Sequence, residues 1–190
     1  MKVSVKYAVK DIWLRGEVDY RQNDGHVFKR HYDVGMRAPL MSLGEGWSLG
    51  LHYRLAYKKS AQQRWELEKR PYIQLQKTFN SSSSVWLPEL KWWLRTRHEF
   101  RFRENKDDSQ RHRIKIKTRL KQSVFHVRPF ISNEYYYDFY KHELTKVRFD
   151  LGVALPKIRA GKPSLYYKHT ATHKGHKRES YSGLVLKLAF

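Results

Sequence analysis

Apolar and polar residues alternate along most of the chain, in segments separated by short connections rich in Gly, Asn, Asp, Ser or Pro. Alternation with a period of two is typical of β-strands, because successive side chains point to opposite faces of a sheet. Helical periodicity is hard to find. The pattern predicts strands at residues 11–22, 26–38, 47–58, 64–79, 88–104, 111–121, 124–138, 145–155, 164–173 and 180–190. Short connections between such strands indicate antiparallel hairpins.

The two faces of each predicted strand differ in chemistry. Between Leu90 and Arg103, one face carries Leu, Trp, Thr, His and Phe, and the other carries mainly Arg, Lys and Glu. A soluble sheet with an apolar core would give the same alternation, so a further signal is needed. Aromatic residues gather near the strand ends, as in the interface girdles of membrane proteins. The polar positions also mix Arg and Lys with acidic residues that can pair with them. We therefore expect the apolar face to meet lipid.

The last predicted strand places apolar residues at every second position and ends on an aromatic residue. This resembles the closing strand of a bacterial outer-membrane β-barrel. The resemblance implies that the outer-membrane insertion machinery reads a terminal signal formed by Leu184, Leu186, Leu188 and Phe190.

Length and composition indicate one domain spanning residues 1–190. No apolar run approaches the ~20 residues of a membrane helix, which excludes a helical membrane protein. We expect an all-β fold, an antiparallel up-and-down transmembrane β-barrel of about ten strands. Twelve strands are possible, because residues 1–10 alternate as well. The first residues lack the apolar core of a secretory signal, so a location in the bacterial outer membrane requires the chain to be the mature part of an exported protein.

Several stretches together carry a family resemblance: residues 13–17, 66–71, 95–103, 111–113, 132–135, 147–152 and the terminal strand. They resemble an uncharacterised family of bacterial outer-membrane β-barrel proteins, a domain of unknown function. The resemblance implies a small barrel with Arg and Glu side chains inside and no established activity.

A set of charged residues lies at the alternate positions that form the polar face of the predicted strands. We call this set the predicted lumen charge network. Its members are Glu17, Glu68, Arg70, Arg95, Arg97, Glu99, Arg101, Arg113, Arg119, Arg128, Glu134, Arg148 and Asp150. One interpretation is a salt-bridged plug, because a barrel of ~8 strands is filled by its own side chains. Another is a narrow anion-selective pore, because rings of Arg and Lys favour anions where water remains.

The net charge of +21 requires anionic partners. The basic connection with Lys174, Lys177 and Arg178 could hold phosphates of lipopolysaccharide, with outer-membrane lipid as the expected partner. The alternative is a soluble basic β-protein that binds nucleic acid, since a high pI with interleaved aromatics is typical of such proteins. The basic residues are spread over nearly every strand without a recognised binding motif, so we expect no nucleic-acid partner.

Catalytic motifs are absent from the sequence. His126 with Asp138, or His142 with Glu143, could in principle serve an outer-membrane hydrolase at the surface, but no nucleophile is placed beside them. Three histidines, His169, His173 and His176, lie in and beside a lysine-rich connection where solvated side chains are the usual outcome. We expect no enzyme activity, no metal and no cofactor.

Overall fold

The computed structural model describes residues 2–23, 26–60, 63–81, 88–104, 107–159, 161–174 and 177–189. Its strands are β1 (Lys2–Val9), β2 (Ile12–Asn23), β3 (His26–Pro39), β4 (Trp47–Lys59), β5 (Trp65–Asn80), β6 (Leu90–Arg103), β7 (Ser109–Leu120), β8 (Arg128–Asp138), β9 (Glu143–Ala154), β10 (Lys162–Lys174) and β11 (Lys177–Ala189). A short 3₁₀ helix, η1 (Met41–Leu43), precedes β4. No helix in this described part of the chain has the length and apolarity needed to cross a membrane.

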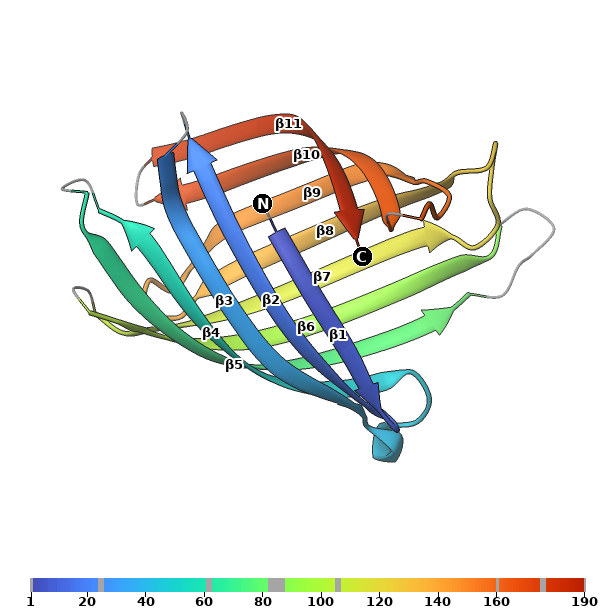
Figure 1. Cartoon of the computed structure of the whole chain (residues 1–190), viewed down its shortest axis with the longest axis horizontal. Helices are drawn as coiled ribbons and strands as arrows, with labels where there is room; N and C mark the ends of the chain where they lie inside the picture. The colour runs from blue at the N-terminus through green and yellow to red at the C-terminus, as the bar shows by residue number, and fades with distance from the viewer. Residues whose placement is uncertain are drawn as a thin grey trace. The chain divides into compact units, whose positions relative to one another are not determined.

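The eleven strands form one sheet in chain order, so each strand pairs with its neighbours in the sequence. Figure 1 shows this order, with β1 to β4 side by side and β8 to β11 side by side. The ladders are antiparallel, as in the β1–β2 hairpin, which runs from Lys2↔Asp19 to Val9↔Ile12. The prediction of an all-β, antiparallel, up-and-down fold is therefore confirmed.

The strand number lies between the two numbers expected from the sequence, and closure into a barrel is not confirmed. The structure has eleven strands rather than ten because the alternating residues of β1 pair with β2. The sheet is not closed, since no ladder joins β1 to β11 among the described residues. With an odd number of alternating strands, the first and last run in the same direction. A closing ladder would therefore have to be parallel, unlike every hairpin in the sheet.

One predicted strand begins later than the sequence indicated. Residues 124–127 form a tight turn, closed by backbone hydrogen bonds from Val124 N to Val127 O (2.8 Å) and from Val127 N to Val124 O (3.0 Å). Phe125 and His126 occupy its centre with φ of 48° and 64°. Positive φ at both central residues is the geometry of a type I′ hairpin turn. The Phe-His sequence does not predict such a turn, because Asn, Asp and Gly are the residues usually found there.

The chain divides into two compact units. Unit 1 contains Met1–Leu75 and Arg97–Arg111, and unit 2 contains Gln76–Thr96 and His112–Phe190. Strands β5, β6 and β7 each contribute residues to both units.

Adjacent residues of one strand show how the two faces of the sheet differ. In unit 2, Leu151 of β9 is paired with Ile131 of β8, and the neighbouring Asp150 is paired with Ser132 on the opposite face. Leu151 is 51% exposed, whereas Asp150 and Ser132 are buried. We call the first the apolar face and the second the charged face.

Unit 1 has the same division. On its apolar face, Met36 of β3 is paired with Leu14 of β2 and Leu51 of β4, and all three are exposed. On its charged face, Asp33 is paired with Glu17 and is only 1% exposed. In each unit the charged face is therefore the buried one, which is the reverse of a water-soluble sheet.

Candidate functional site

The charged face carries buried polar groups where a soluble domain would have an apolar core. Among the described residues, the buried apolar side chains are Ala56, Tyr72, Phe130 and Tyr136. The buried polar residues are Glu17, His31, Asp33, Arg70, Gln74, Arg97, Glu99, Ser109, Ser132, Glu134, Asp138, Asp150 and Thr170. Buried charges are stable only when they are paired and hydrogen-bonded, so the pairing of these groups determines what the face can do.

Asp33 of β3 is the centre of one cluster in unit 1. Its carboxylate accepts hydrogen bonds from Arg54 Nε (2.7 Å) and from the hydroxyl of Tyr72 (2.8 Å). The His52 ring lies 3.5 Å from the same carboxylate and stacks on Tyr72, with the ring centroids 4.6 Å apart. Gly35 makes room for that ring, because a Cβ there would lie 2.1 Å from His52 Nδ1. In this cluster the Asp33 carboxylate is paired with one guanidinium group, that of Arg54.

Two glutamates of unit 1 form a second cluster on β5, β6 and β7. Glu68 accepts hydrogen bonds from Arg70 Nε and Arg101 Nε, both at 2.8 Å. Glu99 is fully buried and accepts from Arg111 Nε (3.0 Å) and Nη2 (2.5 Å). Arg70 Nη1 also lies 3.6 Å from Glu99, so this side chain links the two carboxylates. Forked guanidinium contacts of this kind fix orientation as well as charge.

Arg97 of β6 joins these two clusters within unit 1. It donates to Gln74 Oε1 from Nε (3.2 Å) and Nη2 (2.7 Å), and its Nη1 lies 3.5 Å from Glu99. Its guanidinium carbon lies 4.1 Å from the ring centroid of Tyr72. The charged face of unit 1 is thus a connected network of ion pairs and hydrogen bonds.

Glu134 of β8 is the centre of the charged face in unit 2 and is 1% exposed. Its Oε1 accepts from Arg95 Nη2 (3.0 Å) and Arg113 Nη2 (2.7 Å). Its Oε2 accepts from the Tyr136 hydroxyl (3.0 Å) and Arg148 Nη1 (3.3 Å). Three guanidinium groups therefore share one carboxylate, which leaves a local surplus of positive charge.

A second acidic group of unit 2 is less completely paired. Lys115 Nζ lies 4.0 Å from Asp150 Oδ2, at the outer limit of an ion pair. Asp150 Oδ1 is buried and has no hydrogen-bond partner among the described residues. This distant ion pair does not offset the surplus of positive charge around Glu134.

Most members of the predicted charge network fall into these clusters. Glu17, a further buried member, pairs with Arg15 on the same strand. Arg119 lies apart from the carboxylates, and Arg128, at the first residue of β8, is exposed. The structure thus brings together most, but not all, of the predicted network.

The predicted insertion and lipid-contact residues are described only in part. Leu184 and Leu186 are 78% and 73% exposed on β11, and Arg178 is exposed near its start. Phe190 and the side chains of Leu188, Lys174 and Lys177 lie outside the described residues.

The catalytic alternatives gain no geometric support. His126 is in the turn before β8 and Asp138 is the last residue of that strand, so the strand's length separates them. Asp138 instead accepts backbone hydrogen bonds from Tyr140 (3.1 Å) and Lys141 (3.4 Å) in the following turn. His169 Nδ1 lies 2.8 Å from Ser182 Oγ on the apolar face. No three His, Cys, Asp or Glu side chains of the described residues are grouped to hold a metal.

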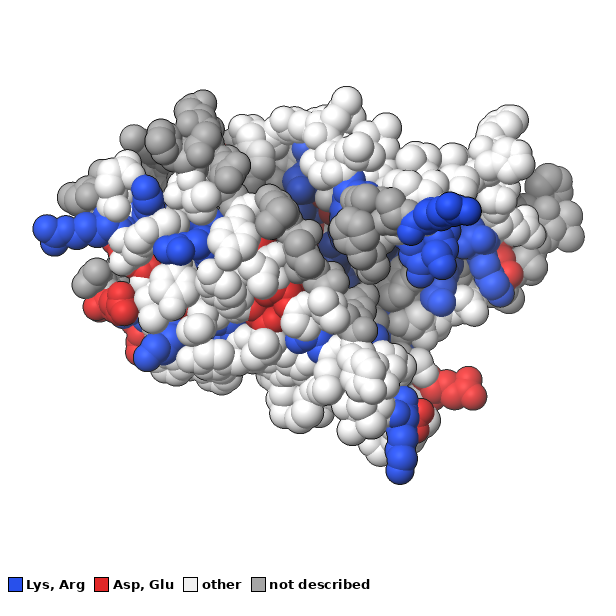
Figure 2. All heavy atoms as spheres, viewed as in Figure 1, with Lys and Arg blue, Asp and Glu red and all other residues white. Residues whose placement is uncertain are grey.

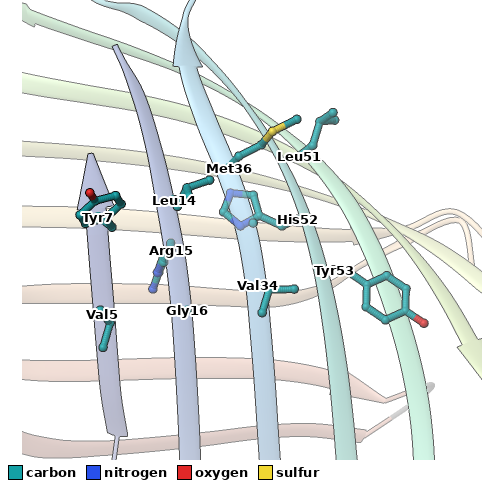
Figure 3. Close-up of a pocket in the computed structure, with 11 residues that line it drawn as sticks. Val5, Tyr7, Leu14, Arg15, Gly16, Val34, Met36, Leu51, His52 and Tyr53 are labelled. Carbon is teal, nitrogen blue, oxygen red and sulfur yellow. The ribbon is translucent and has the colours of Figure 1, made fainter. Parts of the chain in front are cut away.

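A hollow of about 700 Å³ lies on the apolar face of unit 1. Figure 3 shows Val5, Leu14, Val34 and Met36 among the side chains around it, from β1, β2 and β3. It forms where Gly16 stands between its partners Val5 and Val34, because a Cβ at Gly16 would meet nothing within 4 Å. Its apolar wall offers packing surface and no catalytic constellation.

Sequence reasoning missed the cluster around Asp33, including Arg54, His52 and Tyr72. The signal available in the sequence was alternation, because Asp33 lies between Tyr32 and Val34 and so points to the opposite face from both. In the structure it shares that face with Glu17 across the β2–β3 ladder. Pairing partners on different strands are invisible until the register is known.

No family model, curated protein or solved structure matches the chain.

Proposed function

We infer that the chain is a membrane-spanning β-barrel of the bacterial outer membrane, with its apolar face toward lipid and its charged face around an interior filled largely by its own side chains. The observation that carries this proposal is the reversed burial. Glu99, Glu134 and Asp33 are 0–1% exposed, while Leu51, Leu151 and Leu184 are 46%, 51% and 78% exposed. Soluble monomers rarely leave apolar patches larger than a few hundred Å² exposed.

The surface chemistry supports the same proposal. In Figure 2 most of the visible surface belongs to residues without charge, although the chain carries a net charge of +21. Several exposed aromatic residues lie near the strand ends, where the interface girdles of membrane barrels lie, while others such as Tyr53 and Tyr167 lie at mid-strand. The residues near the strand ends include Trp13, Phe28, Phe79, Tyr137 and Phe139.

Polar groups on the apolar face are also paired in a way that suits hydrocarbon. Thr96 Oγ1 lies 2.7 Å from His112 Nε2, and His169 Nδ1 lies 2.8 Å from Ser182 Oγ. An unsatisfied polar group in lipid costs several kcal/mol, so cross-strand hydrogen bonds are needed there.

Cell fractionation tests the proposal against its soluble alternative. The chain, expressed behind an export signal, should be found in the outer-membrane fraction, resist extraction by alkaline carbonate and migrate differently on detergent gels before and after heating. A soluble protein that copurifies with nucleic acid and releases it on addition of salt would contradict the proposal.

An anion-selective pore is the second candidate, favoured by the three guanidinium groups that share Glu134. Planar-bilayer recording separates the two candidates. A self-filled interior predicts no stepwise current. Stepwise anion-selective current that disappears in the variant with Arg95→Ala and Arg148→Ala would establish the pore instead.

A further inference from the structure

A group of cations in unit 2 surrounds a single indole ring on the charged face. The Trp93 ring centroid lies 5.6 Å from Lys91 Nζ, 5.7 Å from Lys117 Nζ and 5.2 Å from the guanidinium carbon of Arg119. Lys117 Nζ also lies 4.1 Å from the ring centroid of Phe130. Strands β6 and β7 therefore bring three positive charges around one indole ring, and β8 adds a second ring beside Lys117.

These cations differ from the other clusters because no carboxylate of the described residues forms an ion pair with them, although Asp150 lies close enough to attract Lys117. Within the described residues, no ion pair joins Lys91, Lys117 or Arg119 to an acidic side chain. The buried Arg119 Nε has no hydrogen-bond partner there. Exposed Arg128 lies close enough to Arg119 to repel it. Positive charge exceeds negative charge around Lys117, which Arg119 and Lys187 repel and Asp150 attracts, and the site is partly desolvated, which favours an anionic ligand.

The donor geometry indicates the kind of anion. A guanidinium offers a planar fork that matches phosphate oxygens, and ammonium groups add point charges around it. The rings of Trp93 and Phe130 hold the cations in place, since a cation over an aromatic face is stabilised by ~0.5–2 kcal/mol. Preorganised cations of this kind lose little conformational entropy when the ligand binds.

We propose that Lys91, Lys117 and Arg119, held around Trp93, form a binding site for a phosphate group. The ligand is a phosphomonoester or inorganic phosphate, carried either by a lipid headgroup or by a small soluble molecule. The site lies wholly within unit 2 and does not depend on the membrane proposal.

Calorimetric titration at constant salt measures the site directly. Inorganic phosphate and pyrophosphate are titrated into the full chain in a maltoside detergent, which carries no phosphate. In a parallel arm, the chain is reconstituted in phosphatidylcholine vesicles with and without phosphatidic acid, and tryptophan emission is recorded. Binding in the first arm identifies a soluble phosphate, and a change only with phosphatidic acid identifies a lipid headgroup. No response in either arm overturns the proposal.

Two variants with equal loss of charge locate the site. Lys117→Gln with Arg119→Gln should weaken binding by at least about tenfold, since each lost charge-assisted hydrogen bond contributes ~1.5–3 kcal/mol. Lys58→Gln with Lys141→Gln removes the same charge from exposed positions and should leave affinity within about twofold. Equal weakening by both variants would show only general electrostatic attraction and would overturn the proposal.

Trp93→Phe provides a readout that does not depend on folding of the charge variants. A phenyl ring still holds the cations, so calorimetric affinity should stay within about threefold of the parent value. The emission change on ligand addition should disappear, because Trp93 is the indole that the cations contact. An unchanged emission response would place the ligand at another part of the chain and contradict the assignment.

Discussion

Two buried carboxylates, Asp33 in unit 1 and Glu134 in unit 2, are equally inaccessible at 1% exposure but have different partners. Asp33 contacts one guanidinium, that of Arg54, and Glu134 contacts three. The comparison leads us to expect that the contribution of a buried cation to stability depends on how many other cations share its carboxylate. It also shows that alternation places charge on one face of a sheet without balancing it.

The largest expected effect comes from removing one cation at each centre. Arg54→Met should lower the free energy of unfolding by about 3–5 kcal/mol, because Asp33 is then buried without a guanidinium. Arg148→Met should change it by less than about 1 kcal/mol, since Arg95 and Arg113 still contact Glu134. Urea unfolding in detergent micelles measures both. Equal losses would mean that the surplus around Glu134 has no energetic consequence.

Charge placed on the apolar face should affect the two units alike. The proposed lipid-facing placement predicts that Leu51→Arg and Leu151→Arg each cost about 2–4 kcal/mol in a bilayer, because an arginine there would meet hydrocarbon. The measurement is unfolding from phosphatidylcholine vesicles, with Lys58→Arg as the matched control at an already basic position. Costs within about 0.5 kcal/mol, as on a water-exposed surface, would contradict a lipid-facing position.

The smallest expected effect is the difference in unfolding free energy lost when each of the two tyrosines that donate to these carboxylates is replaced by Phe. Tyr72→Phe removes a donor from Asp33 and should cost about 1.5–3 kcal/mol, as for a hydrogen bond to a charged group. Tyr136→Phe should cost about 0.5–1.5 kcal/mol, because three guanidinium groups still satisfy Glu134. Chemical unfolding of both variants under one condition provides the comparison, and the reverse order would refute it.

The fold could be predicted from the sequence to the extent that alternation determines it. Strand positions and the antiparallel order follow from a period of two and from turn residues, and β1 was visible as alternation in residues 1–10. The turn at Phe125 and His126 was hidden, because left-handed backbone is usually signalled by Gly or Asn. Closure of the sheet involves strands distant in sequence, about which local pattern carries no information.

The sequence predicted which face of the sheet carries the charged residues, but not which of these residues pair with one another. Parity placed Glu99, Glu134 and Asp150 among the buried charges. It could not show that Glu134 has three guanidinium partners while Asp150, among the described residues, has one distant ion pair with Lys115, because these distances depend on side-chain reach across several strands. The group of cations around Trp93 was not predicted for the same reason.

The most direct test of the account compares neighbouring positions on β8 that point to opposite faces. The chain has no cysteine, so Ile131→Cys and Ser132→Cys each introduce a single thiol for a fluorescent label. In vesicles containing nitroxide-labelled lipid, the label at residue 131 should be strongly quenched, and residue 132 should label slowly or escape quenching. Quenching at 132 with a water-exposed label at 131 would show that the charged face meets the lipid and would contradict the account.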